Sequence, residues 1–345
     1  LSKYDKHWIV YQKQFDSLVQ KGQVTLNGDG SIYNSKITGE EFTSETDGDG
    51  NTISKLSAIN GELTINGNIE IGNEGEIIQK KLTIATTGSV TTGVNNIIIA
   101  SVNSDGTLQA STIDNSGTLT LSGEGTLKNA IDENGKLEIV EGSYIEAVES
   151  VANTINNAGT FIIKANNMTS VNATENTGVL ILKDGNIHQE INDSQTNKTG
   201  LLVIDGKVTN NDNKAINQAA LVVELGAEFA TAFNDLTLAN DTIDNFGQLK
   251  LKDIGNVTLN ENINGLFTNE EGTYIAGTLE LATGTTEADP AYSISSMNYS
   301  LRDNATDVQK EYFAELKNAV EVTGADDKTI AGLVAKNFIA DFYTW

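Results

Sequence analysis

The sequence predicts an all-β fold, a parallel β-helix (β-solenoid) with short α-helical segments at its N- and C-terminal ends. Short apolar runs alternate with Asn, Gly and Asp, a ten-residue motif recurs at a nearly constant step, and no helical period is sustained between residues 23 and 290. We therefore divide the chain into an N-terminal amphipathic helix (1–22), a β-solenoid (23–290) and a C-terminal helical segment (291–345).

The first residues carry apolar side chains at a helical spacing. One face of such a helix would carry the side chains that follow one another at steps of 4, 3, 4 and 3 residues: Tyr4, Trp8, Tyr11, Phe15 and Leu18. Gly22 follows and can end such a helix. A single helix cannot bury its own stripe, so we expect these side chains to pack on the rest of the chain or on another molecule.

The motif "TIDNSGTLTL" at residue 112 has near copies at residues 130, 154 and 242. Aligned on its glycine, it recurs about every 22 residues at Gly117, Gly135, Gly159, Gly178, Gly200, Ala220 and Gly247, and "SVNSDGTL" at residue 101 resembles a further copy. One coil of a parallel solenoid uses about this many residues in two or three strands, which predicts roughly a dozen coils. Strands of a β-sandwich also recur, but without one motif at a constant phase.

The positions within the motif suggest distinct roles. We expect an internal ladder of Leu119, Leu137, Phe161, Leu180, Leu202 and Leu249, with the glycine at a tight corner. In four copies of the motif, an asparagine lies two residues before the glycine: Asn115, Asn157, Asn176 and Asn245. Their amides can bond to the backbone at the corner and to one another along the axis. Thr118 and Thr120 should face solvent.

Helical spacing returns near the C-terminus, at residues 304–322 and 327–342. The chain remains apolar to its last residue, with Phe338, Phe342 and Trp345. Such an end indicates either truncation or docking into a partner. Together with the N-terminal stripe, these residues are the candidate assembly contacts.

Composition excludes several classes of function. The formal charge is −25 and the only arginine is Arg302, so nucleic acid is not expected as a partner. The absence of Cys excludes disulfides and thiolate chemistry. No run of 18 apolar residues exists, so we expect no transmembrane segment.

The residue pattern offers few candidates for a site. The two histidines, His7 and His188, lie in different segments, and a zinc site needs three or four ligands, so we expect no zinc site; no G-x-S-x-G motif occurs. "ETDGDGNTIS" begins like an EF-hand loop, but the position that needs Glu holds Leu56. A solvated acidic turn is the simpler interpretation, and Asp47 and Asp49 remain the only Ca²⁺ candidates. We expect no other cofactor.

Repeats such as "NSGTLTLSGEGTLKN", "NTGVLILKDG" and "NFGQLKLKD" resemble the β-helical passenger regions of bacterial autotransporters and repeat-type surface adhesins. The resemblance implies export, a rigid stalk and no catalytic site. We therefore expect a non-enzymatic, extracellular, structural or adhesive β-solenoid on a bacterial cell surface, with host or cell-surface ligands or other copies of itself as partners.

Two alternatives remain. One is a self-assembling subunit of an extracellular filament or sheath that uses its helical ends for subunit contacts. The other is a polysaccharide-degrading β-helix enzyme; lyases that resemble pectate lyase use a basic residue, usually Arg, and calcium, whereas the solenoid region contains no Arg.

Overall fold

The computed structural model describes residues 8–10, 18–232, 235–245, 247–252, 263–269, 272–276, 278–279 and 297–298. The described strands form an all-β, parallel β-solenoid of about 11 turns, which confirms the predicted architecture. The helical elements in these ranges are two single turns, η1 (Val94–Asn96) and η2 (Ala165–Asn167), and no described helix could cross a membrane. The chain forms two compact units.

The first unit comprises residues 1–181 and 188–194. Its strands are β1 (Trp8–Val10), β2 (Leu18–Val19), β3 (Gln23–Leu26), β4 (Gly30–Ile32), β5 (Lys36–Thr38), β6 (Glu40–Thr46), β7 (Thr52–Ile59), β8 (Glu62–Ile65), β9 (Asn68–Ile71), β10 (Glu76–Gln79), β11 (Lys81–Ile84), β12 (Ser89–Gly93), β13 (Ile97–Val102), β14 (Leu108–Ala110), β15 (Ile113–Asn115), β16 (Thr118–Ser122), β17 (Glu124–Leu127), β18 (Ile131–Asp132), β19 (Lys136–Ile139), β20 (Tyr144–Ala147), β21 (Thr154–Asn157), β22 (Thr160–Lys164), β23 (Thr174–Asn176), the first residues of β24 (Val179–Lys183) and β26 (Ile191–Asn192).

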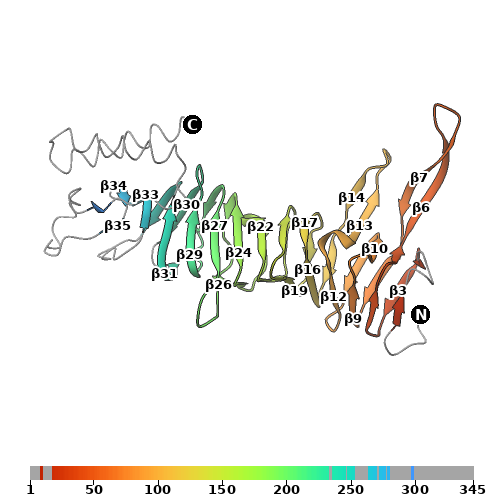
Figure 1. Cartoon of the computed structure of the whole chain (residues 1–345), viewed down its shortest axis with the longest axis horizontal. Helices are drawn as coiled ribbons and strands as arrows, with labels where there is room; N and C mark the ends of the chain where they lie inside the picture. The colour runs from red at the N-terminus through yellow and green to blue at the C-terminus, as the bar shows by residue number, and fades with distance from the viewer. Residues whose placement is uncertain are drawn as a thin grey trace. The chain divides into compact units, whose positions relative to one another are not determined.

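Each coil of the first unit has three walls, seen as successive strands in Figure 1. One coil runs through β15, β16 and β17, and these strands pair in parallel with β18, β19 and β20 of the next coil. Thr120 and its register partner Glu138 are 18 residues apart, so this coil contains 18 residues. Since the coil has three walls, each wall takes about six residues. Successive side chains alternate between core and solvent, and most of the buried ones are aliphatic.

The predicted ladder is buried but is divided between walls. Leu119 pairs with Leu137, and Leu137 pairs with Ile155, whereas Phe161 pairs with Ile145 in the next wall. The motif copies at 112 and 130 are one coil apart and stay in phase. The next copy lies 24 residues after the second, which is one coil plus one wall. The motif therefore encodes a strand, a corner and a strand, and any two walls can use it.

The second unit comprises residues 182–187 and 195–345. Its strands are the last residues of β24, β25 (Gly185–Asn186), β27 (Leu201–Ile204), β28 (Lys207–Thr209), β29 (Ile216–Val223), β30 (Glu228–Ala232), β31 (Leu236–Asn245), β32 (Gln248–Lys252), β33 (Ile263–Asn269), β34 (Gly272–Ala276), β35 (Thr278–Leu279) and β36 (Met297–Asn298).

Parallel pairing continues within the second unit. Leu202 pairs with Leu221, which pairs with Ile243, and all three are buried. The anchor predicted at Ala220 is one residue out of register, because it pairs with Leu201 while the Ala219 N–H donates to the Gly200 carbonyl. The pairing of β29 with β31 is irregular after Gln218, where two steps along β29 correspond to four steps along β31, from Leu238 to Thr242.

Buried asparagines fasten the corners of the first unit, as predicted. Asn157 Nδ2 donates to Asn176 Oδ1 at 2.8 Å, and these residues are register partners on adjacent coils. Asn115 Oδ1 accepts the Gly117 N–H at 3.1 Å. All three asparagines are buried. The Asn245 side chain lies outside the described part of the structure.

The predicted N-terminal helix is wrong where the structure describes it. Trp8–Val10 is β1 and pairs in parallel with β4, and Leu18–Val19 is β2 and pairs with β5. An isolated amphipathic helix of this length is marginal, and the exposed backbone of the first full coil offers hydrogen bonds that override helical periodicity. Tyr4, Tyr11, Phe15 and the whole C-terminal prediction, including Phe338, Phe342 and Trp345, lie outside the described residues.

Candidate functional site: a hairpin pair and a cavity at its base

Two coils of the first unit are much longer than the rest. Gln23 and its register partner Glu62 are 39 residues apart, and Ser89 and Thr118 are 29 residues apart. The extra residues form two antiparallel hairpins, β6–β7 and β13–β14, that project from the coils in Figure 1. We call residues 40–59 and 97–110 the hairpin pair.

The first hairpin leaves the coil because its sequence cannot form a wall. β6 reads EEFTSET, and Phe42 is its one large apolar side chain, whereas a wall strand buries an apolar residue at every second position. The hairpin turns between Asp47 and Asn51, with Gly50 at φ +84°. A three-residue loop that ends in a left-handed glycine is a common hairpin connection.

The second hairpin turns in the same way. The Asn103 N–H donates to the Thr107 carbonyl at 2.8 Å, the Gly106 N–H donates to the Asn103 carbonyl at 2.9 Å, and Gly106 has φ +86°. The segment "SVNSDGTL", predicted as a further copy of the coil motif, is therefore a hairpin turn, and that prediction is wrong. An Asn and a Gly near an apolar strand end suit a coil corner and a hairpin equally well.

Asp47, a predicted Ca²⁺ candidate, closes the first turn. Its Oδ1 accepts the N–H groups of Asn51 at 2.8 Å and Asp49 at 3.0 Å, and its Oδ2 accepts Asn51 Nδ2 at 3.2 Å. The hydrogen bonds from Asn51 lower the pKa of the Asp47 carboxyl. Among the described residues, no group of three or more His, Asp or Glu side chains is placed to hold a metal. Calcium binding by Asp47 and Asp49 stays a prediction.

The two hairpins share a small core at their bases. Its buried side chains are Ile59, Ile78 and Ala100. Its partly buried side chains are Leu56, Ile98 and Val102. They come from β7, from β13 and from β10, the strand between their coils. Because each hairpin packs on the other and on the coil, the hairpin pair is held more firmly than two isolated hairpins would be.

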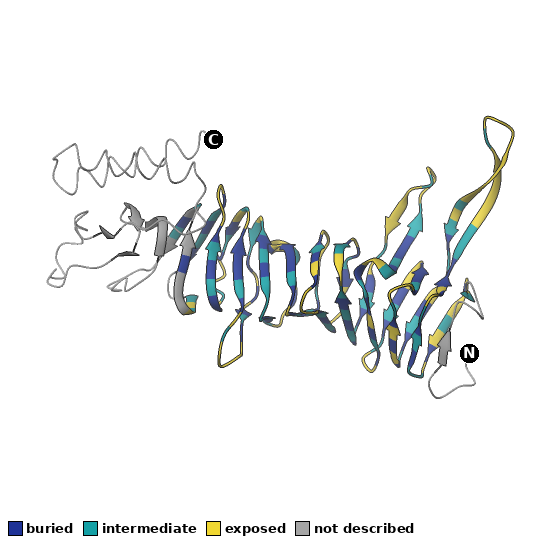
Figure 2. Ribbon diagram, in the orientation of Figure 1, coloured by how far each residue is buried: buried dark blue, intermediate teal, exposed yellow. Residues whose placement is uncertain are grey.

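Large apolar side chains are exposed on the hairpin pair. The exposed fraction is 57% for Phe42, 44% for Ile53 and 50% for Leu108. Figure 2 shows most of β6–β7 as exposed. Around these side chains the strands are polar and carry the ion pair between Lys55 and Glu45 at 3.3 Å. Apolar side chains within a polar surround are typical of sites where a protein binds a partner.

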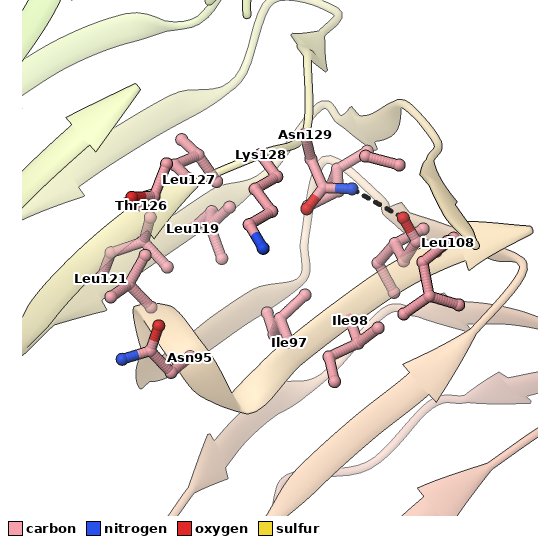
Figure 3. Close-up of a pocket in the computed structure, with 15 residues that line it drawn as sticks. Asn95, Ile97, Ile98, Leu108, Leu119, Leu121, Thr126, Leu127, Lys128 and Asn129 are labelled. Atoms are coloured by element: carbon pink, nitrogen blue, oxygen red, sulfur yellow. Dashed lines mark hydrogen bonds between the residues drawn. The ribbon is translucent and has the colours of Figure 1, made fainter. Parts of the chain in front are cut away.

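A cavity of about 260 Å³ lies at the base of the second hairpin. Its lining is mainly aliphatic and includes Ile97, Ile99, Ile113, Leu119, Leu121 and Leu127, all buried (Figure 3). The turn η1, through which the chain reaches β13, lines one part of the cavity with Val94 and Asn95. Asn95 in η1 holds that turn to the next coil by donating to the Glu124 carbonyl at 2.9 Å.

Two polar side chains at the cavity have different roles. Asn129 is buried, and its Nδ2 donates to the carbonyls of Ile99 and Ser111, both at 2.7 Å, which fixes the hairpin to the coil. Lys128 is exposed and is the one charged residue among the fifteen that line the cavity. Its amino group lies over the apolar lining in Figure 3.

Neither the hairpin pair nor the cavity was among the residues predicted as contacts. Trp8 and Leu18 lie instead in β1 and β2, in the first coil. The signal for the hairpins was present in "EEFTSETDGDGNTIS", which lacks alternating aliphatic residues over most of its length. Comparisons of the chain with protein-family models, with curated proteins and with solved structures found no match.

Proposed function

We propose that this protein is a non-enzymatic, extracellular, adhesive β-solenoid of a bacterial surface, and that the hairpin pair is its binding element. The observation that carries the proposal is the exposure of Phe42, Ile53 and Leu108 on hairpins that have a core of their own. Large apolar side chains are also exposed elsewhere, for example Tyr144 on the coil strand β20, but that strand is part of a coil and not of a projecting hairpin. The repeat style shared with surface adhesins supports the same assignment.

The hairpin pair suits a protein partner. Full burial of an exposed large apolar side chain stabilises a complex by about 1.5–3 kcal/mol. Phe42 and Leu108 are each about half exposed, so each can still contribute about 1 kcal/mol or more on binding. The exposed backbone of β6, which pairs only with β7 in the described part of the chain, can add hydrogen bonds to a partner strand.

The test is binding of the full chain, coupled to fluorescent beads, to host cells and to extracellular-matrix proteins. The variant Phe42→Ser should reduce bound beads about tenfold, because aromatic anchors dominate interface energies. The matched control is Val171→Ser, which removes a side chain that is 89% exposed and outside the hairpin pair. Equal loss in both variants, or no loss for Phe42→Ser, would contradict the role of the hairpin pair.

The non-enzymatic part of the proposal has its own test. The chain is incubated with polyuronates and other acidic polysaccharides, and the products are followed by the absorbance of unsaturated sugars and by reducing ends. We expect neither to rise. Release of either product at a rate proportional to protein concentration would favour the enzyme alternative.

A second candidate function is self-assembly into a filament, favoured by the strands of the first coil. β3 pairs with β8 and β2 with β5, and within the described residues both are the last strands of their sheets. Such edges can pair with another copy. Thr25→Lys places a charge on the exposed side of β3. If the edge mediates assembly, sedimentation should show larger species for the unaltered chain and fewer for this variant.

A further inference from the structure

We propose that the cavity beside β13–β14 binds an aliphatic carboxylate of about ten carbon atoms, with its chain among the aliphatic side chains and its carboxylate on Lys128. This cavity adjoins the exposed surface proposed for adhesion and shares Leu108 with it, but it takes a small ligand instead of a protein partner.

The size of the cavity sets the length of the ligand. An apolar protein cavity of about 150 Å³ stays dry and binds benzene. At the same volume per carbon atom, a cavity of about 260 Å³ takes about ten carbon atoms. The site is smaller than most pockets for drug-sized ligands, so a bulky ring system or a sugar chain does not fit.

The residues that line the cavity determine which kind of ligand chain can enter it. Ile113 and Leu119 are fully buried, and Leu121 is 1% exposed. The buried amide of Asn129 is already engaged, because its Nδ2 donates to two backbone carbonyls at 2.7 Å. An aliphatic chain can fill the cavity without leaving a polar group of its own unpaired.

The residues at the opening of the cavity determine which head group the ligand carries. Lys128 is exposed, and Leu108 and Ala110, which also line the cavity, are exposed as well, so the cavity opens beside this ammonium group. None of the fifteen lining residues is acidic, although the chain holds 47 Asp and Glu. Several other described lysines pair with carboxylates, for example Lys81 with Asp114 at 3.0 Å and Lys136 with Glu138 at 2.8 Å. An anionic head group therefore meets a cation, with no carboxylate among the residues that line the cavity.

The experiment titrates the full chain with decanoate, below the concentration at which it forms micelles, by isothermal titration calorimetry. Butyrate supplies the head group without the long chain, and decanol supplies the chain without the charge. We expect one decanoate per chain, no measurable heat with butyrate, and weaker binding of decanol. Absence of saturable decanoate binding overturns the proposal, as does equal affinity for decanoate and decanol.

Two variants locate the binding. Lys128→Gln should weaken decanoate about three- to fivefold and leave decanol unchanged, because an exposed ion pair contributes modestly. Ala110→Phe fills the mouth from an exposed position and should abolish binding of both ligands while leaving the far-UV circular dichroism unchanged. The matched control Lys164→Gln, which alters another exposed lysine, should bind like the unaltered chain. Undiminished decanoate binding by Ala110→Phe places the ligand elsewhere and overturns the assignment.

Discussion

Asn115 holds one corner of the solenoid, and its removal tests whether buried amides stabilise the stack. Its Oδ1 accepts the Gly117 N–H at 3.1 Å, and its Nδ2 donates to the Lys136 carbonyl at 2.9 Å and to Asn153 Oδ1. Asn115 and Asn153 are both fully buried. The three hydrogen bonds therefore join three successive coils in a place that water does not reach.

Asn115→Ala leaves three buried polar groups without that partner. Since each buried hydrogen bond contributes about 1 kcal/mol net, the expected loss is about 3 kcal/mol of the free energy of unfolding. Urea unfolding followed by circular dichroism gives the loss as a lower midpoint, and an unchanged slope shows that the same structure unfolds. Hydrogen exchange of the Gly117 amide should also become faster, since its acceptor is gone.

The control is Asn172→Ala, which removes one hydrogen bond, from Nδ2 to Thr154 Oγ1 at 2.9 Å, at an exposed position. Its cost should be below about 0.5 kcal/mol. If Asn115→Ala unfolds at the same urea concentration as this control, the buried amides do not hold the coils together and the reasoning is refuted. Asn115→Asp adds a second check: a buried carboxyl has a raised pKa, so this variant should lose stability as the pH rises above about 4.

Three further changes test the core, the charges and the hairpin turn. Leu119→Ala should cost about 2–5 kcal/mol in urea unfolding, because the side chain is fully buried between paired strands; a cost below about 1 kcal/mol would contradict its place in the ladder. The hydrogen bond from Lys136, opposed by burial, lowers the pKa of Glu138 below its ordinary 4.5, so the pair stabilises the fold above that pH and the effect fades as the pH falls. Lys136→Met should reduce the pH dependence of the free energy of unfolding in this range, by at most about 1 kcal/mol, and the midpoint of urea unfolding measures it. Gly50→Ala forces a side chain into φ +84° and should speed proteolysis at the first hairpin, while cleavage elsewhere stays the same.

Much of the fold could be predicted because the coil motif is local. Ile113, Asn115, Gly117 and Leu119 lie within seven residues, and each serves one strand or one corner. Their burial and their hydrogen bonds follow from that short pattern and from alternation along a strand. What the motif does not encode is which wall a copy occupies, because Gly117 and Gly159 lie at corners that lead into different walls. The single ladder predicted from the spacing was therefore divided between walls.

The ends and the hairpins could not be predicted for a different reason. The apolar steps around Trp8 fit a helix, but hydrogen bonds to β4, a strand more than twenty residues later, decide the conformation. Gly106 is followed by Thr and Leu, as Gly117 is, but the antiparallel pairing of β13 with β14 places it in a hairpin turn. Pairing between distant residues is a property of the coil as a whole, and a local pattern does not contain it.

The hairpins and the cavity both occur at coils that are much longer than the rest. The step between register partners is 18 residues from Leu119 to Leu137 and 19 residues from Leu202 to Leu221. The 29-residue step from Ser89 to Thr118 contains β14, which leaves the stack, and the cavity is lined by η1, by both strands of this hairpin and by the next coil. Sites in such a solenoid should be sought where the step between register partners is much longer than in the other coils, as it is from Gln23 to Glu62 and from Ser89 to Thr118.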